Sequence, residues 1–222
     1  MSGVPLDTVV EPIIGWRGWF LRVSAFGPEL VPAGAGRGGW PWRAPMTARC
    51  AEGREHRSPD PSCGCGLSAF KPETAHRSRG SRFPVIGTVS MWGRIVEHQH
   101  GWRAEHAYPD RLRLVCGACL RARTGRRAGI PVVAGTIAGA GASPGFASAW
   151  CATHVPSELS RTWSAPEVAS ALLSRYAVDP LPIDRIEATV DRRRERRPRT
   201  NLDRVEAVTM RFDPPDIVRH LR

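Results

Sequence analysis

Residues 85–108, VIGTVSMWGRIVEHQHGWRAEHAY, predict a β-hairpin at the centre of this chain. Apolar residues alternate with small or polar ones over 85–97, so one face is expected to carry Val85, Val89, Met91 and Ile95. Residues 102–108 alternate in the same way, with Trp102, Ala104, His106 and Tyr108 on one face. The turn is expected between His98 and Gly101. Cysteine and histidine residues flank this hairpin on both sides, at spacings typical of metal ligands.

The set after the hairpin is the clearer of the two. Cys116-Gly-Ala-Cys119 is a C-x₂-C pair and Cys151-Ala-Thr-His154 is a C-x₂-H pair. Two intervening residues let a tight turn point both side chains at one ion, so we predict a Cys₃His zinc site with a treble-clef-like arrangement. The alternatives are free thiols in a core, or a redox C-x₂-C pair, which would need a βαβ setting that the sequence does not indicate.

The set before the hairpin comprises Cys50, His56, Cys63 and Cys65. Its C-x-C pair places two thiols on the same side of an extended chain, and Cys50 and His56 lie near enough to complete a second Cys₃His site. An iron–sulfur cluster with three cysteines and one histidine is an alternative here, and His56 as a solvated loop residue is another. The two sets could also exchange ligands.

Two closed sites fit the composition of the chain. It has 222 residues, 41% of them hydrophobic, with 22 glycines and 20 prolines. A thin core cut by many turns gains from metal cross-links, and four protein ligands leave no open position for catalysis. We therefore predict an α+β protein, mainly antiparallel β with short helices, held together by two structural Zn²⁺ ions.

The remaining segments give weaker signals. A strand is expected over 13–23, a loop over 27–45, a short strand over 46–50 and the start of a short helix in GLSAFK after Cys65. The glycine-rich stretch 121–149 is expected to be a long insertion. A helix from Ser164 to about Arg175 should start with a capping box made by Ser164 and Glu167, and a short strand is expected over 178–183.

These segments predict a three-part organisation. The first part is a β-rich module with the first metal site over 1–110, and the second is a zinc module with the insertion over 111–190. An arginine-rich C-terminal segment over 191–222 completes the chain, with one strand and one short helix expected at its end.

The charge of the chain favours a polyanionic partner such as DNA or RNA. The formal net charge is +11 and the isoelectric point is near 10.7. Lys71 is the single lysine, so part of the arginine content could reflect codon bias. The basic runs RARTGRR and RRRERRPR contribute the candidate phosphate contacts Arg121, Arg123, Arg126, Arg127, Arg192, Arg193, Arg194, Arg196, Arg197 and Arg199.

A third basic feature combines arginine with tryptophan near the N-terminus. Arginines interleave there with tryptophans that could stack on bases if they are exposed, or that belong to the core if they are not. The residues are Trp16, Arg17, Trp19, Arg22, Arg37, Trp40, Trp42 and Arg43.

Two other function classes stay open. One is a protein–protein adaptor, or a subunit of a larger assembly. The other is a metalloenzyme, because His98, His100 and Glu105 resemble the first metal-binding motif of cupins, although the glycine expected before it and a second motif are missing. A polar hairpin tip is the simpler interpretation. A surface ion network explains Glu97, Arg103, Glu105 and His106, and the alternative is that they line a cleft as acid/base groups. No nucleotide-binding or hydrolase motif occurs, so an enzyme is the less favoured class.

The compartment follows from the N-terminus and the thiols. No secretory signal and no apolar run of about 18 residues is present, so we expect a cytoplasmic protein with reduced cysteines and no membrane partner.

Three segments together resemble a known group of proteins. They are EPIIGWRGW, the array C…HxxP…CxCG, and GTVSMWGRIVEHQHGWRAEHAYP. They resemble an uncharacterised protein family of actinobacterial genomes over about residues 11–110. The resemblance implies that residues 50–65 and 85–109 form one module, and it implies no activity, substrate or catalytic residue.

Overall fold

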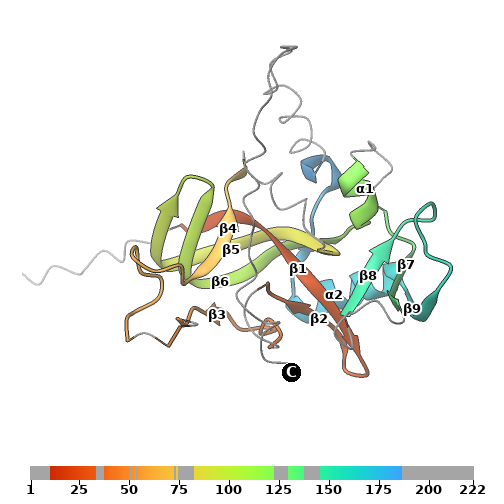
Figure 1. Ribbon diagram of the computed structural model, residues 1–222, viewed down its shortest axis with the longest axis horizontal. Helices are drawn as coiled ribbons and strands as arrows, with labels where there is room; N and C mark the ends of the chain where they lie inside the picture. The colour runs from red at the N-terminus through yellow and green to blue at the C-terminus, as the bar shows by residue number, and fades with distance from the viewer. Residues whose placement is uncertain are drawn as a thin grey trace, which may run out of the picture.

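The computed structural model describes residues 11–33, 38–50, 52–53, 55–72, 74, 83–122, 130–137 and 146–186. Within them the chain is mainly antiparallel β-sheet with few short helices, which confirms the predicted fold class. The elements are β1 Ile13–Ser24, β2 Gly27–Val31, β3 Met46–Thr47, β4 Leu67–Phe70, β5 Val85–His98, β6 Gly101–Leu114, α1 Gly117–Ala122, β7 Val133–Ile137, β8 Phe146–Trp150, β9 Leu159–Ser164, α2 Ala165–Tyr176 and β10 Asp179–Pro180 (Figure 1).

The predicted hairpin is formed by β5 and β6, and its turn lies where the sequence places it. His98 pairs with Gly101, and the pairing runs on to Val85 opposite Leu114. β6 is longer than expected because it continues through Pro109. The register shifts at this point, between Thr88 and Val89, and a strand tolerates proline best at such an irregularity.

Strand β1 joins the two halves of the sheet. Its first half pairs with β5, from Ile13 opposite Met91 to Trp19 opposite Val85. Its second half pairs with β2 and with β8, so the sheet order runs β10-β6-β4-β1-β8-β7-β9. The strand expected over 13–23 is therefore confirmed. It connects the part of the sheet next to the first metal loop with the part next to the second.

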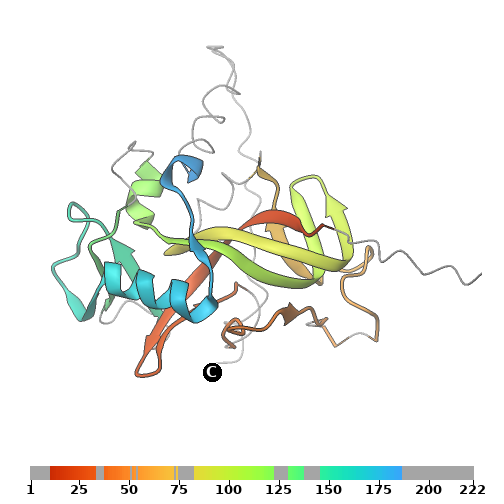
Figure 2. The ribbon, with the colours of Figure 1, turned by 180° about the vertical axis from the view of Figure 1, so that it is seen from behind.

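One core cluster lies between the sheet and α2. It includes Trp19, Trp40 and Met91 from the N-terminal part and Leu172 and Tyr176 from α2, all nearly inaccessible to solvent. Figure 2 shows α2 lying across the strands on one face of the molecule. The boundary expected between residues 110 and 111 falls inside β6, and the core contains residues from both sides of it.

Three local predictions are wrong, and long-range pairing explains each. Residues 27–45 are not all loop, because β2 folds back on β1 with Leu21 opposite Leu30. The segment after Cys65 is strand β4 rather than a helix, since Leu67 pairs with Ala104 of β6. The stretch 121–149 is not a plain insertion, because it contributes β7 and the start of β8.

Helix α2 is confirmed, but the capping box is not formed. The Ser164 side chain makes no cap hydrogen bond, and Ser164 ends β9, where it pairs with Val133. The backbone N–H of Ala165 instead donates to the carbonyl of Val132, at 3.2 Å. The short strands expected over 46–50 and 178–183 shrink to the two-residue β3 and β10. The predicted C-terminal segment 191–222 lies outside the described residues.

None of the helices in the described part of the chain is long and apolar enough to cross a membrane.

Candidate metal centres

The second Cys₃His set is assembled from the end of β6, the start of α1 and the turn after β8. Cys116 follows β6, and α1 begins at the next residue, so Cys119 lies about one helical turn further on. Leu120 donates its N–H to the Cys116 carbonyl at 3.1 Å. β8 ends at Trp150, and the turn that follows is closed by a hydrogen bond from His154 N–H to the Cys151 carbonyl, at 3.0 Å.

The four ligand atoms of this set face one another. His154 Nδ1 lies 3.2 Å from both Cys119 Sγ and Cys151 Sγ, and 3.8 Å from Cys116 Sγ. The Cys119 and Cys151 sulfurs are 3.4 Å apart, and neither is in a disulfide. A tetrahedral zinc ion separates neighbouring sulfur and nitrogen ligands by roughly 3.5–3.8 Å. The group could therefore hold one metal ion.

The electrostatics of this set favour a bound cation. All three cysteines are buried. Burial and the neighbouring thiols raise the pKa of Cys119 to about 12. Burial also opposes ionisation of Cys151, but hydrogen bonds from His154 and Cys119 outweigh it and lower its pKa to about 6. Three thiolates in one buried place repel one another, so only a cation lets all of them ionise together.

The second set differs in one respect from the treble-clef-like arrangement expected. The helix begins within the first pair, at Gly117, and the hairpin of β7 and β8 follows it. The second pair, Cys151 and His154, lies in a turn, and the next helix, α2, starts only at Ala165.

The first Cys₃His set lies in the loop between β3 and β4. Cys50 comes shortly after β3, and Cys65 lies two residues before β4. The Cys50 and Cys63 sulfurs are 3.8 Å apart, and Cys65 Sγ is 4.0 Å from both ring nitrogens of His56. The four ligand atoms lie within 4.8 Å of one another, so this group too could hold a metal ion.

Strand β6 anchors the first set through Arg103. Its Nη1 donates to the carbonyl oxygens of Cys63 and Cys65, the second at 2.9 Å. The positive charge acts on the adjacent thiol: burial opposes ionisation of Cys65, but hydrogen bonds from the loop and the Arg103 charge lower its pKa. The C-x-C turn therefore has a fixed orientation relative to the hairpin.

A second contact fastens the same loop to the hairpin. Arg57 makes a bidentate ion pair with Glu105, both N–O distances being 2.9 Å. The hydrogen bonds from Arg57 and from the Arg94 N–H lower the pKa of the Glu105 carboxyl. Arg103 and Glu105 are two residues apart on β6, so one strand holds the metal loop at two points.

The sequence indicates both quartets of ligands but not these anchors. The sequence suggests an ion network at the hairpin for Arg103 and Glu105, but nothing local to them points to residues 57–65. The signal that could identify them is the register of β6 with β4, where Ser68 lies opposite Arg103.

The residues of the cupin-like alternative do not form a metal site in the structure. Within the described parts of the chain, only the two Cys₃His groups bring three or more potential ligands together. Glu105 is paired with Arg57, which leaves His98 and His100 at the hairpin turn without it. Burial and the nearby charges of Arg103, His100 and Lys71 lower the pKa of His98.

The predicted nucleic-acid contacts fall mostly outside the described residues. Arg121 lies in α1, but its side chain is not described, and Arg123, Arg126, Arg127 and the residues from Arg192 to Arg199 lie beyond the described ranges. Most of the excess positive charge of the chain belongs to residues outside the described ranges.

The tryptophan and arginine residues near the N-terminus divide into core and surface. Trp16, Trp19 and Trp40 are buried, while Trp42 is 53% exposed. Arg17 lies over the Trp40 ring, 5.1 Å from its centroid, and donates to the Ser68 carbonyl. Arg22 pairs with Glu29, and Arg37 lies outside the described ranges. The expected stacking surface is therefore reduced to the neighbourhood of Trp42.

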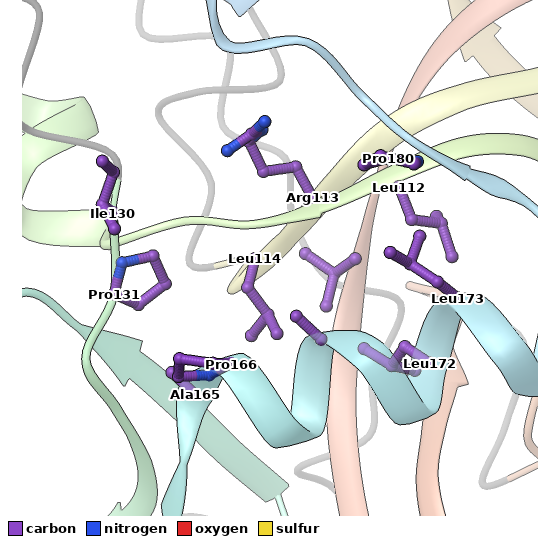
Figure 3. A pocket seen from close by; sticks show the side chains of 12 residues that line it. Leu112, Arg113, Leu114, Ile130, Pro131, Ala165, Pro166, Leu172, Leu173 and Pro180 are labelled. Carbon is purple, nitrogen blue, oxygen red and sulfur yellow. The ribbon is translucent and has the colours of Figure 1, made fainter.

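A small cavity lies between the hairpin and α2, with a volume of about 180 Å³. Leu114 and Leu172 point into it, whereas the guanidinium of Arg113 points away from α2 (Figure 3). Arg113 is the single charged residue among those that line the cavity, and its Nε donates to the Leu181 carbonyl at 2.5 Å. The cavity therefore offers no acid–base pair for catalysis.

The two metal centres occupy opposite ends of the β5–β6 hairpin (Figures 1 and 2).

Comparisons of this chain with protein families, with curated proteins and with solved structures find no match.

Proposed function

We propose that this chain is a zinc-stabilised accessory or regulatory protein that associates with nucleic acid. One observation carries the zinc assignment: each of the two clusters gathers three thiols and one imidazole with ligand atoms within 4.8 Å of one another. This donor set and coordination number are those of structural zinc, and four protein ligands leave no open position for a substrate.

A single ion fits the first cluster better than an iron–sulfur cluster. Ligands bound to different iron atoms of a bridged cluster lie further apart than ligands that share one ion, and all four ligand atoms of this set lie within 4.8 Å of one another. We therefore assign one Zn²⁺ to each set.

Structural zinc suits a protein with this composition. The loops that carry Cys50 to Cys65 are polar and have little apolar surface of their own to bury. Metal ligation supplies the folding free energy that such loops lack. The zinc centres would then hold the two ends of the sheet, and the scaffold would carry its basic segments.

The partner is inferred from charge. A net charge of +11 attracts a polyanion, and the basic runs at 121–127 and 192–199 provide guanidinium groups that bind phosphate. The alternative of a metalloenzyme at the hairpin tip has less support, because the carboxylate of Glu105 is paired with Arg57.

The test is binding of the full zinc-loaded chain to labelled DNA and RNA, measured by fluorescence anisotropy at several salt concentrations. We expect the association constant to fall steeply with salt, because each neutralised phosphate releases counterions. A chain that binds neither nucleic acid at low salt, or binds with no salt dependence, would contradict the proposal. Copurification with one protein in fixed stoichiometry, without nucleic acid binding, would instead favour the adaptor.

A further inference from the structure

Trp42 is presented to solvent by a loop that is otherwise fixed. Two residues earlier, Trp40 is buried and packs edge-on against Trp19, with ring centroids 5.8 Å apart. Tyr176 of α2 donates its hydroxyl to the Trp40 carbonyl at 3.1 Å. On the other side, the N–H of Arg43 donates to the hydroxyl of Tyr108 at 3.0 Å. The loop around Trp42 is thus held at both ends, yet its side chain stays 53% exposed.

The backbone at Arg43 adds a second observation. Arg43 has φ of 58°, in the left-handed region that costs a non-glycine residue about 1–2 kcal/mol. The tyrosine hydrogen bonds maintain this conformation against that cost. Backbone strain of this kind clusters at binding sites, where the surrounding structure maintains it.

One cation lies over the Trp42 ring, and a second arginine, Arg43, follows Trp42 directly in the chain. The cation over the ring is the guanidinium of Arg175, 5.2 Å from the ring centroid, and its Nη1 donates to the Phe26 carbonyl at 2.5 Å. Among the described residues no carboxylate pairs with Arg175 or Arg43. Phe26, at the tip of the β1–β2 turn, is 87% exposed. The exposed indole of Trp42 and the guanidinium of Arg175 therefore lie together. The Phe26 carbonyl is bonded to the same guanidinium, and Arg43 is the residue after Trp42.

We propose that these four residues, which we name the Trp42 platform, bind single-stranded nucleic acid. The platform comprises Phe26, Trp42, Arg43 and Arg175. An unpaired base would stack on the exposed part of the Trp42 ring, and the two guanidinium groups would contact the flanking phosphates. The site requires a single strand because bases within a duplex do not expose their faces. This inference rests on the proposed association with nucleic acid and names the strand state and the contact residues.

The test compares variants of the full zinc-loaded chain on a labelled oligothymidine, an oligouridine and a duplex of the same length. Trp42→Ala should weaken binding to the single strands roughly 5- to 150-fold, because stacking of one base contributes about 1–3 kcal/mol. Trp42→Phe, which keeps an aromatic face, should restore most of the affinity. Binding to the duplex should change little. Zinc content and melting temperature establish that each variant is folded.

A matched charge control uses another exposed arginine. The double variant Arg43→Gln, Arg175→Gln should reduce the dependence of log K on log salt by about 1.4 on single strands, since each phosphate contact contributes about 0.7. Arg161→Gln on β9 removes one charge away from the platform and should leave the slope nearly unchanged.

The outcomes separate this inference from the function on which it rests. If the native chain binds single strands and Trp42→Ala binds equally well, the platform is wrong while the proposed function stands. Equal losses on duplex and single strands would also exclude stacking on an unpaired base. If the native chain binds no nucleic acid, the proposed function fails and the platform fails with it.

Discussion

Arg103 of β6 donates a hydrogen bond to the carbonyl oxygen of Cys65, at 2.9 Å. The same nitrogen also donates to the Cys63 carbonyl, so one guanidinium spans the C-x-C turn of the first metal centre. β6 ends at Leu114, two residues before Cys116 of the second centre. One strand therefore orients the ligands of the first centre and delivers a ligand to the second.

The contact of Arg103 predicts a selective loss of metal affinity. Arg103→Met should weaken zinc binding at the first centre by roughly 10–100-fold, the usual effect of removing a group that orients metal ligands. The second centre should keep its affinity, because Arg103 contacts none of its residues. Chelator competition, followed by release of the two zinc equivalents, measures both affinities. Arg111→Met, a change of the same kind on the same strand, is the control. Equal weakening at both centres would contradict this role.

The two centres should lose zinc independently. Cys63→Ser should remove one zinc equivalent and Cys151→Ser the other, because the two quartets share no ligand. We expect the larger fall in melting temperature for Cys151→Ser, since Cys116, Cys119 and Cys151 are all buried together. The double variant His98→Ala, His100→Ala should keep both equivalents, as measured by elemental analysis. Loss of zinc in that variant would instead support the hypothesis of a metal site at the hairpin tip.

Tyr176 predicts a measurable contribution to stability. Its hydroxyl accepts the N–H of Leu30 at 3.0 Å and donates to the Trp40 carbonyl at 3.1 Å. Tyr176→Phe leaves both backbone groups without this partner in the core, which should lower the free energy of unfolding by roughly 1–3 kcal/mol. Chemical denaturation of the zinc-loaded chain measures the change. An unaltered free energy of unfolding would show that these hydrogen bonds do not fix the loop.

The same tyrosine predicts a dependence on alkaline pH. Burial raises the pKa of Tyr176 to about 12, while a tyrosine in an unfolded chain has a pKa of about 10. The neutral phenol therefore stabilises the fold fully below about pH 10, and this contribution is lost as the pH rises toward 12. The free energy of unfolding should fall over this interval in the native chain and less steeply in Tyr176→Phe. Equal slopes in the native chain and in Tyr176→Phe would contradict the prediction.

The sequence allowed prediction of what depends on local pattern. The alternation in 85–108 predicted the hairpin, ligand spacing predicted both quartets, and the start signal of Ser164 and Glu167 predicted α2. Strands β2 and β4 were missed because their pairing with β1 and β6 overrides the glycine and proline signals around them. The capping box predicted at Ser164 is not formed, and the Ala165 N–H at this helix start donates to the carbonyl of Val132, from another part of the chain.

The metal centres were predictable in their ligands but not in the residues that anchor them. Thiol and imidazole ligands carry their own chemistry and are visible from spacing alone. Arg103 and Arg57 act through contacts with residues about 40 and 48 positions away, which only the register of the sheet establishes. Trp42 could not be told from the buried Trp40 by sequence, since both lie in the same tryptophan and arginine pattern.

Metal content, combined with unfolding, tests the central claim most directly. Elemental analysis of the purified chain should find two zinc ions per molecule, and removing them with a chelator should abolish the cooperative thermal transition. Returning zinc should restore the transition. A chain that contains no metal and melts with the same midpoint before and after chelation would contradict this account, as would six cysteines found in disulfides.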